Sequence, residues 1–569
     1  MAHVITRPCC NDGSCVEVCP VNCIHPTPDE DDFLTAEMLY IDPATCIDCG
    51  ACIDECPVGA IYPDDELDAA DEPFLQINAD YYNDHDVDGG LAHSSAVPRV
   101  PSDRTLRVAI VGAGPAAFYA ATALTDLRQV SVDMFDRLPT PYGLVRAGVA
   151  PDHPKTKGVE TSFARTEKRK NFTYHLNVDV GTHITHDELA ERYGAVLYAV
   201  GAPHDRHLGI PGEDLPGSFP ATEFVAWYNG HPEFADRNPL PAADRPSAGD
   251  AAGRAVVIGN GNVALDVARV LLEDGETLAA TDIADHALAA LNESPIREVV
   301  VIGRRGIENA AFTNAEFVSL ADLDGIDVVI DPAELVLSDS TQRALDDGSL
   351  DSTIATKIRL AREFAARFDE LDGLDERRRI VFRFLASPVE ITGDDTVTGV
   401  RCVRNEYTAP GAVAPTAEQF DTAASVVVRS VGYRGRPVPG IPFDDERAVV
   451  PSADARVTDG PGGDVVPGLY VAGWIRRGPT GGIGRNRMCG EEAAAAILED
   501  FAGGALTEPA KSADDVADLV ASRGARHVGI DGWQRIDAAE RAAGNQSGRR
   551  RVKLVTAEEL EAVALADGT

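Results

Sequence analysis

The chain of 569 residues has few basic residues for its size: 51 Lys and Arg stand against 92 Asp and Glu, which gives a formal net charge of −41. Nucleic acid and anionic lipid both bind to basic faces, so this balance argues against either as a partner. The remaining composition, 44% hydrophobic and 25% charged, is ordinary for a globular protein with large cores. The length allows roughly three or four domains.

The sequence also lacks a secretory signal and an unbroken membrane-spanning run. Its first residues, MAHVITRPCC, have no basic start followed by an apolar stretch. The uncharged run VAIVGAGPAAFYAATALT (108–125) approaches spanning length, but a Gly-Ala-Gly-Pro break divides it into a strand-like part and a helix-like part. We therefore expect a cytoplasmic protein without a membrane segment.

Cysteine is almost absent beyond residue 56, where only Cys402 and Cys489 occur among the eleven. The other nine are clustered, which without a signal peptide indicates metal ligation rather than disulfides. A shift of 37 residues aligns this segment with itself, so that CVEVCPVNCI matches CIDECPVGAI. The second copy, CIDCGACIDECP (46–57), is the C-x2-C-x2-C-x3-C-P run of bacterial two-cluster ferredoxins.

In such a run three closely spaced thiolates hold one iron–sulfur cluster, and the fourth cysteine, before proline, reaches the other cluster. The spacing therefore predicts two ligand sets. The first ligand set is Cys9, Cys15 and Cys56. The second ligand set, which we expect to hold a [4Fe–4S] cluster, is Cys19, Cys46, Cys49 and Cys52.

Asp12 stands in the first copy where the second copy has Cys49. A carboxylate is a harder and weaker ligand for iron than a thiolate, so a corner held by Asp12 is readily lost. We expect a [3Fe–4S] cluster on the first ligand set; the alternative is a [4Fe–4S] cluster with Asp12 as its fourth ligand. The triple spacing, the proline after both fourth cysteines and the repeat disfavour zinc. Over residues 1 to about 62 the chain resembles seven-iron bacterial ferredoxins.

Two glycine turns further along the chain predict dinucleotide sites. RVAIVGAGPAAFYAA (107–121) is typical of a strand, a turn and a helix, in which Gly112 permits the tight turn and Gly114 lets the backbone approach a pyrophosphate. The helix N-terminus favours the phosphates, because its N–H groups are unpaired there. The next strand ends in Asp136, at a suitable distance to bind a ribose hydroxyl.

The second turn, RAVVIGNGNVALDVARVLL (254–272), repeats this plan with Gly259 and Gly261. The strand after it ends in Arg304 and Arg305 instead of an acid, and two guanidinium groups suit the 2′-phosphate of NADP. The pair of turns suggests FAD at the first and NADPH at the second. The residues alone leave NAD(H) open at the first turn.

From about residue 105 to 556 the chain resembles the adrenodoxin reductase family of ferredoxin–NADP reductases. The whole chain resembles the actinobacterial fusion of a seven-iron ferredoxin to such a reductase. Besides the second turn, the resemblance rests on four segments: LPTPYGLVRAGVAPDHPKTKGV (138–159), LYAVGAPHDR (197–206), VVRSVGYRG (427–435) and LYVAGWIRRGPTGGIG (469–484).

The resemblance implies FAD contacts at Ala116, Asp136, Leu144, Val180, Trp474, Gly481, Gly482 and Ile483. It implies NADP contacts at Arg206, Asn262, Val263, Ala264, Leu265, Arg304, Arg305, Glu316 and Gly481. His153 matches the flavin-side histidine of the family. For His153, a proton-handling role and a structural hydrogen bond in a loop both stay open.

We expect an α+β ferredoxin domain at residues 1–62, followed by an α/β reductase with two Rossmann-like units. Residues 63–104 are acidic and then rich in Gly, Ser and Pro, which predicts a wrap and a flexible tether from about Asp84. An NADP domain, 205–425, is expected as an insertion between two halves of an FAD domain, 105–204 and 426–569. The basic run GRRRVKL (548–554) is expected to be a solvated surface.

The resemblance implies a ferredoxin–NADP reductase that passes electrons from NADPH through FAD to the iron–sulfur clusters. One-electron acceptor proteins such as a cytochrome P450 or a separate ferredoxin would then receive them. One alternative is an electron-transfer subunit resembling the small subunit of glutamate synthase, which would need a large partner subunit. Another is an adaptor whose ferredoxin segment docks a separate oxidoreductase. The sequence gives neither the direction of flow nor the cluster nearest the flavin.

Overall fold

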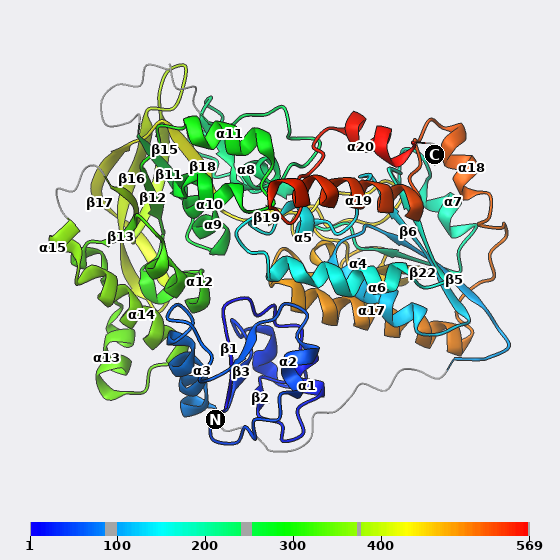
Figure 1. The fold of residues 1–569 in the computed structure, drawn as a ribbon, viewed down its shortest axis with the longest axis horizontal. Coiled ribbons are helices and arrows are strands. Elements are labelled where there is room, and N and C mark those ends of the chain that lie inside the picture. The colour runs from blue at the N-terminus through cyan, green and yellow to red at the C-terminus, as the bar shows by residue number, and fades with distance from the viewer. Residues whose placement is uncertain (1, 86–99, 241–252, 372–376, 567–569) are drawn as a thin grey trace.

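The computed structural model describes residues 2–85, 100–240, 253–371 and 377–566. These residues form an N-terminal unit (residues 2–85), a unit built on a seven-stranded sheet and a unit built on a six-stranded sheet (Figure 1). The N-terminal unit lies at the bottom of the view, between the six-stranded unit on the left and the seven-stranded unit on the right. Most of the expected tether, residues 86–99, lies outside the described residues.

The N-terminal unit repeats itself in its backbone. Its two antiparallel strand pairs join β1 (His3–Ile5) to β4 (Ile61–Pro63), and β2 (Ile24–His25) to β3 (Tyr40–Ile41). Its two short helices, α1 (Ser14–Glu17) and α2 (Ala51–Glu55), begin after Gly13 and Gly50, whose φ angles are 76° and 73°. Glycine adopts this left-handed conformation without the steric cost of a Cβ. The 37-residue sequence repeat is thus also a repeat of structure.

Helix α3 (Pro73–Asp84), in the acidic segment, packs against the N-terminal unit. The Asn78 side chain accepts the N–H groups of Ile5 at 3.1 Å and Ile41 at 2.9 Å, which ties the helix to both strand pairs. Tyr81 stacks on Tyr40 with ring centroids 4.4 Å apart. The sequence did not indicate this helix, because its few apolar residues are scattered among acids and amides.

The seven-stranded sheet has the order β20-β21-β22-β8-β5-β6-β7, with parallel strands from β22 to β7. Its strands are β5 (Leu106–Val111), β6 (Val130–Asp136), β7 (Phe172–Leu176), β8 (Ala195–Tyr198), β20 (Ser452–Ala453), β21 (Arg456–Thr458) and β22 (Val465–Val471). Apolar runs such as LRVAIV become central strands because both faces of the sheet are covered. One face packs on α4 (Pro115–Thr125), α6 (Glu160–Glu167) and α17 (Ile483–Gly503), and the other on α7 (His186–Ala190) and α18 (Val516–Ser522).

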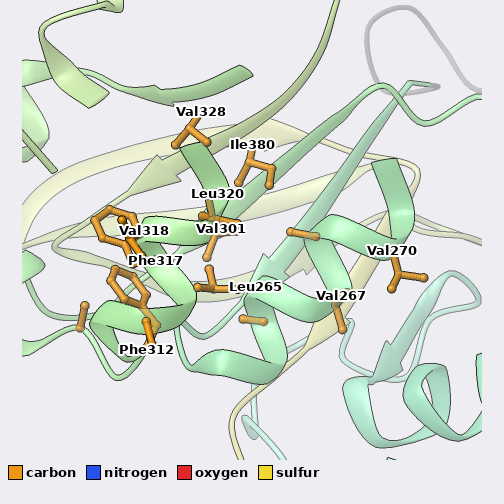
Figure 2. Packing of buried hydrophobic residues seen from close by; sticks show 14 of the residues in the cluster. Leu265, Val267, Val270, Val301, Phe312, Phe317, Val318, Leu320, Val328 and Ile380 are labelled. Atoms are coloured by element: carbon orange, nitrogen blue, oxygen red, sulfur yellow. The ribbon is translucent and has the colours of Figure 1, made fainter. Parts of the chain in front are cut away.

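The six-stranded sheet is wholly parallel, with the order β10-β18-β11-β12-β14-β13. Its strands are β10 (Ser218–Pro220), β11 (Arg254–Ile258), β12 (Glu298–Ile302), β13 (Ile326–Ile330), β14 (Arg378–Arg383) and β18 (Val426–Arg429). Its principal helices are α8 (Ala221–Tyr228), α9 (Asn262–Leu272), α10 (Gly275–Ala279), α11 (Asp285–Glu293), α12 (Asn314–Val318), α13 (Asp339–Asp347), α14 (Ser352–Ala365) and α15 (Phe368–Leu371). Figure 2 shows part of this core, with Leu265 of α9 beside Val301 of β12 and with Phe312 stacked on Phe317 at 4.5 Å.

A three-stranded antiparallel sheet extends the six-stranded unit: β15 (Ala386–Thr392), β16 (Gly399–Ala409) and β17 (Ala412–Ala423). The chain crosses between the two larger units at β9 (His204–Asp205) and β19 (Tyr433–Arg434), which pair with each other. Because β18 still belongs to the six-stranded sheet, we propose that the inserted unit extends to Arg429, beyond the boundary at residue 425 that the sequence suggested.

The basic run at residues 548–554 is not a solvated surface, contrary to our expectation. It follows α19 (Ile530–Ser547) and precedes α20 (Ala557–Ala564). Arg551 is only 2% exposed and donates to Glu540 at 2.8 Å, while Lys553 lies 3.2 Å from Asp282 of the six-stranded unit. Buried charges need such partners, and Asp282 lies far away from Lys553 in sequence. Among the described residues, no helix is both long and apolar enough to cross a bilayer.

Candidate functional site

The first glycine turn lies at the carboxyl end of β5. Gly112 has a φ of 106°, and a Cβ there would lie 2.3 Å from the carbonyl oxygen of Ala199, so the turn requires glycine. Gly114 precedes α4, and no heavy atom lies within 4 Å of the position its Cβ would take. This open side gives a pyrophosphate access to the N–H groups at the start of α4.

The N-terminus of α17 reaches the same place. A Cβ on Gly490 of α17 would lie 2.5 Å from the carbonyl oxygen of Ala116, so the two helices touch at this glycine. Gly482 precedes α17, and no heavy atom would contact its Cβ either. The N-termini of α4 and α17 are both open, and the dipole of each helix favours an anion there. The predicted FAD residues Gly112, Gly114, Ala116, Gly482 and Ile483 all belong to these two helix starts.

The other predicted FAD residues differ in how they are placed. Helix α16 (Trp474–Arg477) begins with Trp474, whose indole N–H donates to the carbonyl oxygen of Gly481 at 3.3 Å. Leu144 begins α5 (Leu144–Ala147) and is 39% exposed, so it offers an apolar surface for a planar group. Val180 is buried in the apolar layer on the other face of the sheet. Asp136 accepts the N–H groups of Ala113 at 2.8 Å and Leu138 at 2.9 Å, and burial raises the pKa of its carboxyl.

The second turn has the same design. Gly259 has a φ of 116°, and a Cβ there would lie 2.1 Å from the carbonyl oxygen of Ser430, whereas Gly261 is open before α9. Asn262 accepts the N–H of Thr313 at 2.8 Å, which ties the turn to α12. Of the other predicted positions in α9, Val263 is half-buried, and Ala264 and Leu265 are fully buried.

The predicted phosphate arginines are available to a ligand. Arg304 is exposed and Arg305 half-buried, and neither guanidinium bonds to any residue that the structure describes. Arg206 is exposed just after the crossing strand β9. Its backbone N–H donates to the carbonyl oxygen of Gly432 at 3.1 Å. Unpaired arginines at the carboxyl end of β12 fit a 2′-phosphate, which guanidinium groups bind through paired hydrogen bonds.

A network of charged side chains around His153 joins all three units. Nε2 of His153 lies 2.7 Å from Nη2 of Arg269 and 3.8 Å from carboxylate oxygens of Asp266 and Glu316. Arg7 of the N-terminal unit contacts the same nitrogen and lies 3.4 Å from Glu316. Since a guanidinium only donates, Nε2 is an unprotonated acceptor. Burial lowers the pKa of His153; Asp266 and Glu316 oppose this shift, and Arg269 and Arg7 add to it.

The ligand atoms of His153, Asp266 and Glu316 lie within 4.8 Å of one another, a spacing that a metal ion could bridge. Arg269 already supplies the positive charge there, because it is 1% exposed and bonds to Asp266 at 2.8 Å and Asp152 at 2.6 Å. Sequence reasoning missed Arg7, Asp152, Asp266 and Arg269. Asp266 and Arg269 lie three residues apart on one helix face, which is a readable signal, but no local pattern indicates Arg7.

The cysteines of each ligand set come together. All four of the second set line one cavity in the N-terminal unit. In the first set Cys15 is buried and Cys9 and Cys56 are half-buried, close enough that their charges would repel each other. Burial raises the pKa of Cys9 and of Cys52 to about 12, so the thiolate form at these positions needs a cation such as iron. Both sites therefore fit an iron–sulfur cluster.

Asp12 is held by its own loop and by the reductase. Its carboxylate accepts the hydroxyl of Ser14 at 2.7 Å and the N–H of Ser14 at 3.3 Å. Arg487 of α17 donates to the carbonyl oxygen of Asp12 at 3.1 Å and to the hydroxyl of Ser14 at 2.6 Å. The loop that contains Asp12 is thus fixed against the seven-stranded unit.

The fold and these sites define an oxidoreductase with two dinucleotide-binding units and an iron–sulfur domain. Two family models agree: the pyridine nucleotide-disulphide oxidoreductase model matches residues 106–313, and the 4Fe-4S binding domain model matches residues 39–62. A solved structure, Mycobacterium tuberculosis FprA in complex with NADPH, is 46% identical, with a TM-score of 0.73, and covers 81% of this chain and 100% of its own.

Two curated relatives match nearly the whole chain, and both are named "Probable ferredoxin/ferredoxin--NADP reductase". The protein from Mycobacterium tuberculosis (strain ATCC 25618 / H37Rv) is 47% identical over 576 residues, which is 99% of this chain and 95% of the relative. The protein from Mycobacterium leprae (strain TN) is 46% identical over 571 residues, 99% of this chain and 98% of the relative. The chain belongs to the ferredoxin/ferredoxin–NADP reductase family. This confirms the predicted fold class and enzyme class, and it favours the reductase over the glutamate synthase alternative.

Proposed function

We propose that the chain passes electrons from NADPH, by way of FAD, to a [3Fe–4S] cluster on the first ligand set and a [4Fe–4S] cluster on the second. The observation that carries this proposal is that the first ligand set packs against α17, beside the first of the chain's two dinucleotide-binding turns. When bound, FAD accepts a hydride and releases electrons singly, which links a two-electron carrier to one-electron clusters.

The chain's own residues bind and align these groups. The starts of α4 and α17 present N–H groups to a pyrophosphate, and Arg304 and Arg305 present donors to the 2′-phosphate that distinguishes NADP from NAD. His153 lies where the loop after α5 meets α9 of the six-stranded unit. Once the guanidinium groups of Arg7 and Arg269 release Nε2, neutral His153 can take up a proton there, and we assign it that role.

The structure supports three irons over four at the first ligand set. The carboxylate of Asp12 already accepts two hydrogen bonds from Ser14. If the carboxylate moved to bind iron, these hydrogen bonds would break. The predicted first ligand set has three thiols, one fewer than a [4Fe–4S] cluster takes from the second set. In the variant Asp12→Cys we expect the iron content to rise from seven to about eight per chain. An unchanged iron content would contradict a [3Fe–4S] site.

The decisive experiment is EPR during anaerobic titration of the holoprotein with NADPH. An oxidised [3Fe–4S] cluster is paramagnetic, whereas an oxidised [4Fe–4S] cluster is not. We expect the signal in the protein as isolated and its loss on adding NADPH. Without the signal and with eight irons, Asp12 is a ligand. With a signal that NADPH leaves intact, the chain does not connect NADPH to its clusters.

The acceptor is expected to be a one-electron carrier protein, such as a cytochrome P450 or a separate ferredoxin. We place the protein in the cytoplasm, since all eleven cysteines are unbridged and thiols persist in that reducing compartment.

A further inference from the structure

The two ligand sets have different relations to the reductase. Cys9 and Cys56 of the first set pack against the same apolar layer as Ile483, the first residue of α17. The carbonyl oxygen of Cys10 accepts the N–H of Gly484 at 2.7 Å. The first set therefore lies directly beside a helix start that we predict to hold FAD.

The contact at Gly484 is close enough to exclude any side chain. A Cβ on Gly484 would lie 1.6 Å from the carbonyl oxygen of Asn11, so the cysteine loop rests on the backbone of α17 itself. One turn further along α17, Arg487 donates to Ser14 and to Glu17 at 2.9 Å. The N-terminal unit also lies close to the reductase at Gly158. A Cβ on Gly158 would lie 3.1 Å from the carbonyl oxygen of Pro57, the residue after Cys56.

The second ligand set faces away from these contacts. Cys49 is exposed, and Ile47 beside it is 57% exposed. The cavity formed by the second set is lined by the N-terminal unit alone, among the residues that the structure describes. An exposed loop bearing two of the four ligands, Cys46 and Cys49, leaves the second site open to solvent and to another protein.

We infer that the first ligand set is where electrons enter the N-terminal unit, and that the second set, at the loop around Cys49, is where they leave it. Electron transfer falls steeply with distance, so the site packed on the reductase receives first and the solvent-facing site delivers. This inference rests on the proposed function. One NADPH and two oxidised acceptors give NADP⁺, one proton and two reduced acceptors, each of which takes one electron at the second site.

The order of the sites can be tested on the wild-type holoprotein with a water-soluble dysprosium chelate, which speeds the EPR relaxation of clusters near the surface. The first cluster is observed in the oxidised protein and the second after reduction with dithionite. We expect the chelate to raise the half-saturation power of the second cluster's signal several-fold more than that of the first. An equal effect, or a larger effect on the first cluster, would overturn the inference.

A variant separates this result from the proposed function. In Cys49→Ser, with iron content measured, NADPH should still abolish the signal of the first cluster. If NADPH no longer abolishes this signal in Cys49→Ser but still does so in wild type, electrons reach the first site through the second. That result would contradict the inferred order of the two sites. If NADPH reduces neither cluster in wild type but dithionite reduces both, the proposed function fails instead, and the inferred order falls with it.

Discussion

At the scale of single residues, Arg7 of the N-terminal unit places its positively charged side chain against residues of the reductase. Its guanidinium contacts Nε2 of His153 and lies 3.4 Å from Glu316, beside Arg269 on the same nitrogen. A residue two positions before a cluster ligand thus helps to set the protonation of the candidate proton carrier. Burial, Arg7 and Arg269 disfavour protonated His153, whereas Asp266 and Glu316 favour it.

The variant Arg7→Ala should raise the pKa of His153, because one neighbouring positive charge is removed. Protonation of His153 then begins at higher pH, so we expect the acid limb of NADPH-driven ferricyanide reduction to move to higher pH. The measurement is the pH profile of kcat. Tyr62→Phe is a matched control, because it removes a contact with Lys155 at the same interface without touching His153. Identical profiles for Arg7→Ala and wild type would contradict this role.

Arg304→Ala should raise KM for NADPH far more than KM for NADH. The guanidinium is exposed and bonds to none of the described residues, so its removal costs little stability but loses a charged hydrogen bond to the 2′-phosphate. Such bonds contribute about 1.5–3 kcal/mol, or about tenfold to a hundredfold in KM. Arg343→Ala, an exposed arginine that bonds to its own helix, is the control. An equal change for both nucleotides would remove the 2′-phosphate argument.

At the scale of elements, the two glycines of the second turn have separate tasks. Gly259→Ala forces a side chain into the left-handed conformation and against Ser430, so we expect a loss of about 1–3 kcal/mol in the free energy of unfolding. Gly261→Ala meets no protein atom and should fold normally, yet its methyl group stands where the pyrophosphate approaches. Urea denaturation and KM for NADPH separate the two effects. Equal stability losses would contradict this division.

Arg551→Ala should destabilise the fold strongly, because it leaves Glu160 and Glu540 buried with one partner fewer. Removing one partner of a buried ion pair costs about 3–5 kcal/mol. Arg359→Ala is the control: this residue pairs with Glu363 at 2.8 Å on the exposed side of α14, and such surface pairs contribute less than about 1 kcal/mol. Chemical denaturation followed by circular dichroism compares the two. If both variants lose a similar free energy of unfolding, the ion pairs of Arg551 stabilise the fold no more than a surface pair does.

Features that depend on residues close together in the sequence were predictable from it. Features that depend on contacts with residues far away in the sequence were not. Gly112 and Gly259 adopt positive φ angles in turns of a few residues, and the cysteine spacing belongs to a single loop, so a linear pattern reveals them. Helix α3 depends on Asn78 binding two strand pairs, and the run at 548–554 depends partly on Asp282 and Glu160, hundreds of residues away. Arg7 belongs to the second kind, since only the folded chain brings it to His153.

At the scale of the whole molecule, the N-terminal unit is held by both larger units. Towards the six-stranded unit, Glu37 accepts Lys357 at 3.1 Å and the N–H of Asn314 at 2.6 Å. Towards the seven-stranded unit, Arg487 binds the loop of the first ligand set. Arginines and lysines are scarce in a chain of net charge −41, and several of them lie at this junction. The contacts between units therefore depend partly on charge.

Reversing two of these charges, in Lys357→Glu combined with Arg487→Glu, should loosen the N-terminal unit from the reductase. Each new carboxylate faces an acid, so we expect a larger radius of gyration by small-angle X-ray scattering and slower reduction of the clusters by NADPH. Ferricyanide reduction should persist, because that acceptor can take electrons at the flavin. Arg523→Glu, which breaks a pair within the seven-stranded unit, is the control. High salt should weaken the wild-type contact in the same direction, since the Debye length falls to about 3 Å at 1 M. If the radius and the rate of cluster reduction stay unchanged, apolar packing alone holds the first ligand set against α17, and the charges at the junction serve only the network around His153.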